Sequence, residues 1–440
     1  MAHGGKAMHS SDNEKTIGVW LTGAIVVSTV IGSGIFLLPS SLAPLGKNAL
    51  IAWIISGAGA LCIAFALSRV VRGDGRGIQN YIEEVFGPMA GFIVTFSFWV
   101  GSWTAMAATA IAAAAALSRI VPGLSDPWSI AMVALGTTAT VAAVNARGIR
   151  ASGSFSMITV GLRILPILAV IIVVLLRQAK GQPLAPIAST PVTANNIATA
   201  VTLTLFAIAG FEAGTAPVSK VRNPTWAIPA ALMGGTAFCV LLYLFSSTAV
   251  TLILSPSTTA SSLAPYADAL KADFGETTAK LAAVGIAIAA IGCLNSNLLC
   301  AGELGYSMGL RGDLPSLLAR TGSNNTPVIS QMFATALTFA LVLSNTSKST
   351  VQLFVFVSLL SAIGSLAVYL VGGLAAIRIG ARGVAMVAIS LGVAFSLFAF
   401  YGAGLEANLW GLVLMLGGLA VRWICRLRLR ATKLSAEGGA

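Results

Sequence analysis

Two short apolar segments contain glycines where a regular helix would be weakened. The first reads Gly32-Ser33-Gly34, followed by Pro39, and the second places Gly210 two residues before Glu212. Each glycine weakens a helix by about 1 kcal/mol relative to alanine, and a serine offers the backbone a competing hydrogen bond. The segments therefore predict breaks with freed backbone N–H and C=O groups. Such groups can bind a carboxylate and an ammonium, so the pattern predicts a receptor for a zwitterion.

Glu212 is the residue in these segments that most directly indicates function. An acid in the middle of an apolar span is costly in lipid, so its side chain is expected to face the protein interior or an aqueous cavity. Two alternatives stay open at this point. The small residues could form a packing face between helices, and Glu212 could be a protonated acid with a structural hydrogen bond.

The composition places these segments in a membrane. Of the 440 residues, 57% are hydrophobic and only 9% are charged, whereas a soluble protein carries roughly a quarter charged residues. Apolar runs of about 20 residues, long enough to cross a hydrocarbon layer of ~30 Å, recur along the chain. Residues 1–16 are polar and the first apolar run has full length, so we expect no cleavable leader.

Apolar length and turn residues predict an all-α integral membrane protein of about twelve transmembrane helices. The expected spans are near residues 17–43, 49–71, 87–118, 127–146, 155–177, 196–218, 228–254, 280–306, 328–344, 350–377, 384–403 and 407–425. The two interruptions fall in the first and sixth spans, which correspond if five spans are followed by five related ones. Interrupted segments at matching places in two halves indicate the binding site of a transporter.

The net charge of +12 reflects orientation rather than nucleic-acid binding. In the expected topology, most of the 26 Lys and Arg lie on one side, including the basic tail Arg422–Lys433. The positive-inside rule then places both termini in the cytoplasm. We expect the spans to lie in a bacterial inner membrane. We expect the tail to contact anionic lipid, and a regulatory role for it stays open.

The residue types exclude several other classes of function. The five cysteines are scattered through apolar segments and the two histidines lie in the N-terminal tail, so the sequence predicts no metal site, no cofactor and no catalytic set. A channel would need a continuous polar stripe or a ring of charges. A non-transporting sensor with the same architecture stays open.

With these motifs in place, the sequence resembles the amino acid–polyamine–organocation (APC) transporter superfamily. The first motif is similar to that of bacterial arginine/agmatine antiporters, and the resemblance covers residues 17–380. The ordered motifs are Ile31-Gly32-Ser33-Gly34-Ile35-Phe36-Leu37-Leu38-Pro39, Phe206-Ala207-Ile208-Ala209-Gly210-Phe211-Glu212, Val221-Arg222-Asn223-Pro224, Gly292-Cys293-Leu294-Asn295 and Gly312-Asp313-Leu314-Pro315.

The resemblance implies a LeuT-like fold, in which a five-plus-five inverted repeat has discontinuous helices 1 and 6 and is followed by two C-terminal helices. It divides the chain into a cytoplasmic tail (1–16), a first repeat (17–177), an external loop (178–195), a second repeat (196–380), spans 11 and 12 (381–425) and a basic cytoplasmic tail (426–440).

The resemblance also implies a substrate site at the two breaks. Gly32, Ser33 and Gly34, next to Ile31, would bind the substrate carboxylate. The backbone around Ala207, Ile208 and Gly210 would meet the amino group, with Phe206 as an aromatic gate over the pocket.

Two charged residues receive coupling roles from the resemblance. Glu212 resembles the acid that such antiporters use in proton transfer. Arg163 stands where sodium-independent members often have Lys, so its cation would replace sodium. Arg keeps its proton, which argues for exchange or for proton coupling through Glu212. An ion pair of Arg163 with Glu303, or snorkelling to the interface, stays open.

The distal pocket decides the expected substrate. By resemblance its positions are Met106, Asn297 and Leu359, and two of these three are apolar. We therefore expect sodium-independent exchange or proton-coupled transport of neutral or modestly polar amino acids by a monomer or homodimer. The alternative is an antiporter of cationic amino acids or amines, of the arginine/agmatine or polyamine type.

Overall fold

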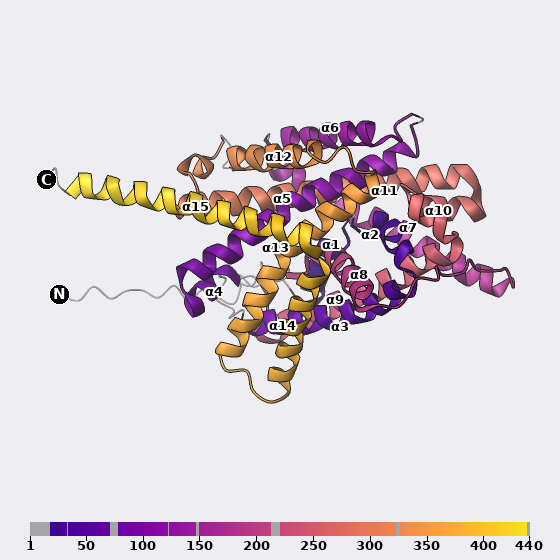
Figure 1. The fold of residues 1–440 in the computed structure, drawn as a ribbon, viewed down its shortest axis with the longest axis horizontal. Coiled ribbons are helices and arrows are strands. Elements are labelled where there is room, and N and C mark those ends of the chain that lie inside the picture. Colours follow the sequence, from indigo (N-terminus) through magenta and orange to yellow (C-terminus); the bar gives the residue numbers. More distant parts are fainter. Residues whose placement is uncertain are drawn as a thin grey trace.

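A computed structural model describes residues 18–32, 34–70, 78–121, 123–146, 149–212, 221–322 and 326–437. The expected N-terminal tail and Ser33 lie outside these residues. Helices form the architecture of the described chain (Figure 1). In chain order they are α1 (Val19–Val30), α2 (Gly34–Leu42), η2 (Ala43–Leu45), α3 (Lys47–Val70), α4 (Ile78–Phe86), α5 (Pro88–Ser118), α6 (Pro127–Ala146), α7 (Ile149–Ala179), α8 (Ala194–Ile208), α9 (Pro224–Ile253), α10 (Pro256–Ser261), α11 (Pro265–Leu310), η5 (Ser316–Ala319), α12 (Val328–Leu343), α13 (Thr350–Arg378), α14 (Val384–Gly402) and α15 (Gly404–Glu437).

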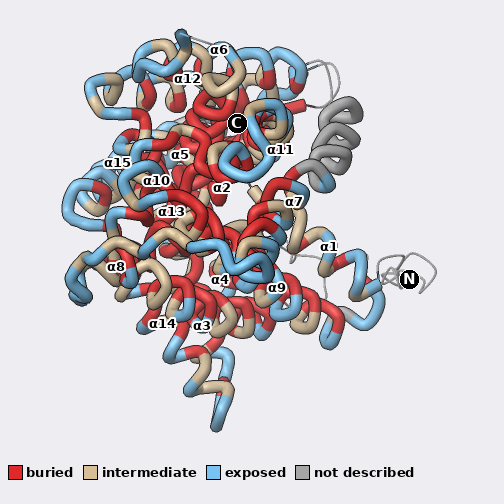
Figure 2. The backbone as a smooth tube through the Cα atoms, turned by 90° about the vertical axis from the view of Figure 1, so that its right-hand side faces the viewer, coloured by how far each residue is buried: buried red, intermediate tan, exposed pale blue. Residues whose placement is uncertain are grey.

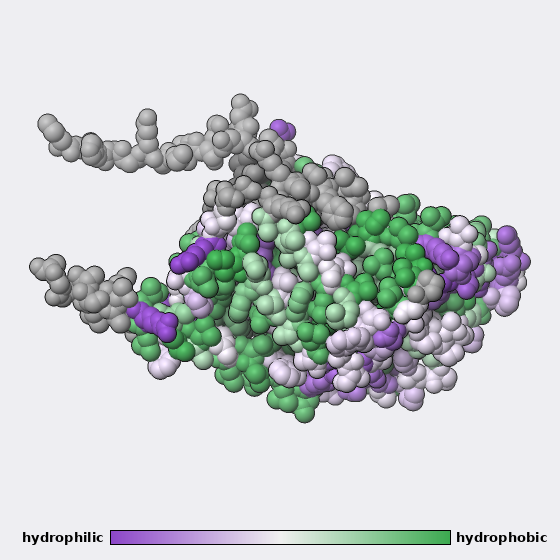
Figure 3. Space-filling view, turned by 90° about the horizontal axis from the view of Figure 1, so that it is seen from above, coloured by the Kyte–Doolittle hydropathy of each residue, from purple (hydrophilic) through white to green (hydrophobic). Residues whose placement is uncertain are grey.

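The helices have the length and polarity of membrane spans. Within the described residues, 8 helices are long and apolar enough to cross a membrane, and the bent pair of α1 and α2 would make 9. The helices α8 and α12 are shorter and apolar. Hydrophobic residues cover much of the face shown in Figure 3, and hydrophilic residues gather mainly towards one end. The prediction of an all-helical, multi-pass membrane protein is therefore confirmed.

The helix α5 forms the centre of the bundle. In its most apolar window 89% of the residues are buried, compared with 11% in α15, which lies at the periphery. Figure 2 shows the buried residues concentrated around α5, α13 and α2. Small residues allow this close packing: a Cβ atom on Gly364 of α13 would lie 2.6 Å from the Cα atom of Gly101 in α5. Without a hydrophobic driving force in lipid, such close backbone contacts hold helices together.

The element α11 contains a bend near its start. Gly275 has φ +80°, which a residue with a side chain rarely adopts, and it divides the long helix. A short helix, Pro265–Phe274, precedes this bend, and the predicted eighth span follows it. Several residues of the short helix, including Tyr266 and Leu270, are buried rather than exposed. It therefore packs onto the bundle instead of lying on the surface.

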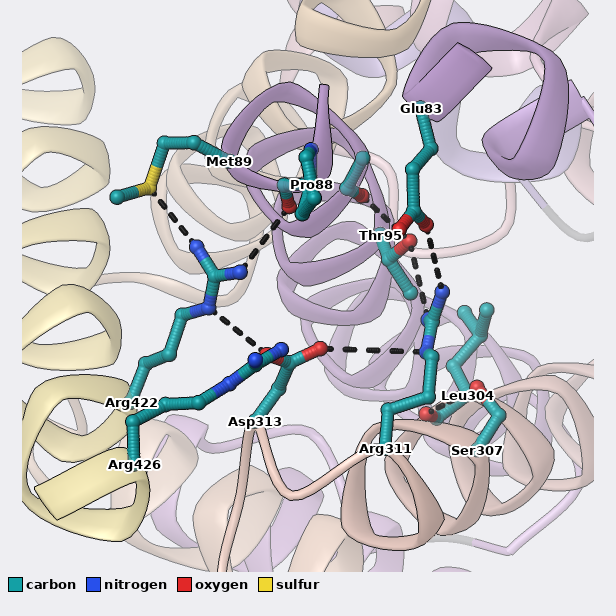
Figure 4. Close-up of polar contacts among 11 residues, drawn as sticks. Glu83, Pro88, Met89, Thr95, Leu304, Ser307, Arg311, Asp313, Arg422 and Arg426 are labelled. Carbon is teal, nitrogen blue, oxygen red and sulfur yellow. Dashed lines mark hydrogen bonds and ion pairs between the residues drawn. The ribbon is translucent and has the colours of Figure 1, made fainter. Parts of the chain in front are cut away.

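Ion pairs fasten the two ends of the bundle. At the end near α10, called the loop end here, Arg119, directly after α5, contacts Asp268 at 2.9 Å and Glu276 at 2.6 Å. At the opposite end, called the terminal end because α15 finishes there, Asp313 accepts from Arg422 at 2.8 Å and Arg426 at 2.9 Å (Figure 4). These contacts join α5 to α11 at one end, and α15 to the turn after α11 at the other.

Candidate functional site

The first predicted break lies between α1 and α2, whose axes differ by 51°. The last regular hydrogen bond of α1 runs from Ile31 N to Val27 O at 2.9 Å. Gly32 N then donates a hydrogen bond to Val30 O, only two residues earlier, at 2.6 Å. The carbonyl groups at the end of a helix have no partner within it. The break therefore requires donors from other elements.

Two side chains from neighbouring helices supply these donors. Arg163 of α7, only 3% exposed, donates from one terminal nitrogen to Ser28 O at 3.2 Å and to Ile31 O at 2.9 Å. The Tyr243 hydroxyl of α9 donates to Val30 O at 2.8 Å. A cation at the C-terminal end of a helix also interacts favourably with the helix dipole. Arg163 thus acts as a cap for α1, and it forms no ion pair with the exposed Glu303, the alternative partner.

The second predicted break follows α8. Ala209 leaves the helical conformation with ψ 147°, and Gly210 has φ +115°. Gly210 N donates to Glu212 Oε2 at 3.0 Å, and the Tyr369 hydroxyl of α13 donates to the same oxygen at 2.8 Å. Phe211 stacks on the Tyr369 ring with centroids 5.2 Å apart. The Glu212 carboxyl group is therefore buried, oriented and hydrogen-bonded.

The two breaks touch each other at glycines. A Cβ atom on Gly210 would lie 2.8 Å from Thr29 O, in the last turn of α1. A Cβ atom on Gly34 would lie 2.9 Å from the Phe206 ring of α8. The close approach of these backbones therefore places both breaks at one point.

A cavity of about 220 Å³ opens beside the breaks. Its walls come from α1, α2, α5, α7, α8, α11, α13 and the residues that follow α1 and α8. The lining consists of Ser28, Thr29, Val30, Gly32, Gly34, Phe98, Gly101, Ser102, Ala105, Thr109, Arg163, Phe206, Ala207, Ala209, Gly210, Glu212, Cys293, Ser296, Asn297, Cys300, Ser361 and Ser365. Small polar groups therefore surround one acid and one arginine.

Most of the predicted site residues line this cavity. They are Gly32, Gly34, Arg163, Phe206, Ala207, Gly210, Glu212 and Asn297. Three others do not: Ile31 and Ile208 are fully buried beside the breaks, and Met106 packs in an apolar cluster of α5. Leu359 lines a separate hollow together with Lys348 and Glu406. Ser33 lies outside the described residues.

Several lining residues were missed by the sequence analysis. Ser102 of α5, Ser296 and Cys300 of α11, and Ser361 and Ser365 of α13 all contribute to the wall. In α11 the lining positions 293, 296, 297 and 300 have the spacing of one helix face. Serines in an apolar helix usually bond their own backbone, as Ser102 does with Phe98 O at 2.8 Å. This spacing of small polar residues is the signal that could have found them.

Comparison with known proteins agrees with this architecture. The sequence profile of the amino acid permease family matches residues 17–402. The chain is 26% identical over 418 residues to the putrescine transporter PotE of Haemophilus influenzae, covering 91% of this chain and 95% of that protein. It is 24% identical over 419 residues to PotE of Escherichia coli strain K12, covering 91% and 94%. It is 26% identical over 347 residues to the cadaverine/lysine antiporter of Escherichia coli strain K12, covering 76% of each.

The family match extends over most of the chain, and it includes both broken helices and the cavity between them. Its members move amino acids or amines across membranes, as the resemblance of the sequence to the APC superfamily implied. The chain therefore belongs to the amino acid permease family, and it is a membrane transporter rather than an enzyme.

Proposed function

We propose that this protein is a secondary transporter that exchanges cationic amino acids or their amines by alternating access. The observation that carries this proposal is the cavity between two broken helices, with the carboxyl group of Glu212 in its wall. A carboxylate beside small hydroxyl groups suits an alkylammonium, because each of its N–H groups can donate to one of these oxygens.

The substrate class is revised from the sequence-based expectation of a neutral or modestly polar amino acid. That expectation depended in part on Met106 and Leu359, but Met106 packs in the core and Leu359 lies at another hollow. The positions that do face the cavity on α5 and α13 are polar, namely Ser102, Ser361 and Ser365. The names of the similar proteins, a putrescine transporter and a cadaverine/lysine antiporter, also favour the cationic alternative.

The fold within the membrane is part of the same proposal. We infer twelve spans arranged as a five-plus-five inverted repeat, with α1–α2 and α8 at its discontinuous helices and α14 and α15 outside the repeat. The terminal end would face the cytoplasm of a bacterial inner membrane, because most of the Lys and Arg of the predicted topology lie on that side. The loop end, which has the smaller share of Lys and Arg in the predicted topology, would face outwards.

Within the cavity, individual residues receive distinct roles. Gly32 and Gly34 would bind a substrate carboxylate at the start of α2, and the backbone near Ala207 and Gly210 would meet the amino group. Phe206 would act as a gate, since its ring meets Phe354 of α13 edge-on at 6.1 Å. Asn297 would hydrogen-bond the distal part of the substrate.

The two charged residues would set the coupling. Arg163 already donates hydrogen bonds to the carbonyls of Ser28 and Ile31 at the end of α1. This supports sodium-independent transport, since these oxygens would otherwise suit a cation. Glu212 would carry the proton sensitivity, because a buried carboxyl group in a membrane protein commonly serves in proton relays.

Exchange in proteoliposomes tests the proposal. Vesicles loaded with unlabelled putrescine, cadaverine, lysine, arginine or leucine would be given labelled lysine, labelled putrescine or labelled leucine outside. We expect rapid uptake only with a cationic substrate inside, unchanged when sodium is replaced by choline. Uptake driven by internal leucine but by none of the cations would instead support the neutral-substrate expectation. Empty vesicles provide the control for leak.

A further inference from the structure

Two hollows, one at the centre of the bundle and one at the terminal end, share two helices in their walls. On α5, Thr95 lies one turn before Phe98 and two turns before Ser102, both of which line the cavity. On α11, Ser307 lies two turns beyond Cys300, which also lines it. Thr95 and Ser307 line a second hollow of about 390 Å³ at the terminal end. The two spaces therefore lie on successive turns of the same pair of helices.

Glu303 lies on α11 between the two hollows. Its side chain is exposed, and it is three residues, or about 4.5 Å along the axis, beyond Cys300. It makes no hydrogen bond or ion pair with any part of the chain that the structure describes. Cys300 lines the central cavity and Leu304 lines the hollow at the terminal end, so Glu303, between them on α11, lies beside the walls of both.

Three basic residues at this end are engaged elsewhere. Arg311 contacts Glu83 at 3.7 Å, Asp313 at 3.9 Å and Thr95 at 3.5 Å, while Arg422 and Arg426 share Asp313 (Figure 4). None of these cations neutralises Glu303. An acid on a membrane helix is costly against lipid, so its exposed face is expected to meet water. Its negative charge then acts on whatever passes along this side of α11.

We propose that Glu303 is a substrate-recruiting residue, which attracts alkylammonium ions into the passage between the terminal face and the central cavity. This rests on the proposed function in one respect only, the cationic charge of the substrate. One unpaired charge beside a narrow passage raises the local concentration of ions of opposite sign and the rate at which they enter. Because Glu303 lies outside both hollow linings, its effect would be on entry and exit rather than on the geometry of the bound substrate.

The first test measures the charge in the passage without any need for transport. Purified protein would be treated with a permanently cationic and a permanently anionic methanethiosulfonate, and modification of Cys300 alone would be followed by peptide mass mapping. The ratio of the two rates cancels any change in thiol reactivity. We expect Glu303→Gln to lower the cation-to-anion ratio roughly fivefold, as removal of one charge at about 8 Å in water implies. Glu303→Asp should preserve the ratio, as should Glu406→Gln at the other end of the molecule.

The second test measures entry of the substrate. Vesicles of known orientation would report the KM for putrescine presented at each face. Glu303→Gln should raise the KM at the terminal face roughly fivefold, by the same charge arithmetic, and leave the KM at the loop face unchanged. An unaltered reagent ratio, or an unaltered KM at the terminal face, would overturn the proposal. If the wild-type protein exchanged no cation at all, the proposed function would fail, while the reagent ratio would still decide whether Glu303 attracts cations.

Discussion

The break between α1 and α2 and the break after α8 meet at the same point, but they are stabilised in different ways. At the first, backbone carbonyls accept hydrogen bonds from Arg163 and Tyr243, which come from α7 and α9. At the second, the backbone N–H of Gly210 donates to Glu212, only two residues further along. One break is held by a permanent cation from a distant helix, and the other by a local acid that can gain or lose a proton.

This difference separates a fixed part of the site from a changeable one. Arginine stays charged at any accessible pH, so the end of α1 keeps its cap in every step of a transport cycle in which α7 stays in contact. Gly210 N and the Tyr369 hydroxyl both donate to one oxygen of Glu212, Oε2, so a proton gained or lost by this carboxyl group changes the charge that both donors meet. The second break is therefore suited to respond to a proton.

Loss of the distant cap should have the largest effect. Arg163→Leu would leave the carbonyls of Ser28 and Ile31 without their donor, at a cost of about 3 kcal/mol. We expect a marked drop in the midpoint of thermal unfolding in detergent, and an exchange rate reduced roughly a hundredfold, as that energy implies at 1.4 kcal/mol per factor of ten.

Arg163→Lys is the matched control for the cap. It keeps the charge but loses the planar fork of donors, and should retain part of both the stability and the exchange. If Arg163→Leu had the same thermal unfolding midpoint and the same exchange rate as the wild type, the α1 break would not depend on a cation at all.

Contact between the breaks is the next target. Gly210→Ala places a side chain at φ +115° and 2.8 Å from Thr29 O, which costs about 1–3 kcal/mol in backbone strain alone. Exchange should fall roughly tenfold or more, as this energy implies. Gly136→Ala in α6, where a Cβ atom would meet nothing within 4 Å, should leave the exchange rate unchanged. Equal behaviour of the two variants would show that the breaks need not touch.

The response to protons should be lost with the local acid. Glu212→Gln removes the titrating group and the carboxylate that suits an alkylammonium, while keeping an oxygen that can accept from Gly210 N. We therefore expect slower exchange of cations, with a remaining rate that no longer varies with pH. Tyr369→Phe removes one hydrogen bond, keeps the ring stacked on Phe211, and should leave exchange pH-dependent. An unchanged pH profile in Glu212→Gln would rule this residue out as the proton-linked group.

The smallest effect should come from the second donor at the α1 break. Tyr243→Phe removes the hydrogen bond to Val30 O, worth about 1 kcal/mol, while Arg163 still holds the neighbouring carbonyls. Thermal unfolding should shift down slightly, with exchange and its pH dependence intact. Tyr401→Phe, at an exposed ring, serves as the comparison. A loss as large as that of Arg163→Leu would mean that the hydroxyl, rather than the cation, is the main cap.

The breaks were predictable because their signals are local. Two glycines around a serine, or a glycine beside an acid, weaken a helix wherever they stand, so the sequence alone placed both interruptions and marked Glu212. The composition likewise determined the membrane environment, since only lipid can solvate a surface with so few charges.

The contacts across the cavity were decided only by the tertiary structure. An apolar helix such as α5 carries no strong polarity pattern, so its sequence does not say whether Met106 or Ser102 faces the cavity; the rotation of α5 against α11 and α13 decides this. The sequence around Arg163 does not predict that its partners are the carbonyls of Ser28 and Ile31. Those contacts arise because the fold brings the Arg163 side chain to the end of α1. A buried guanidinium then donates to the acceptors within its reach.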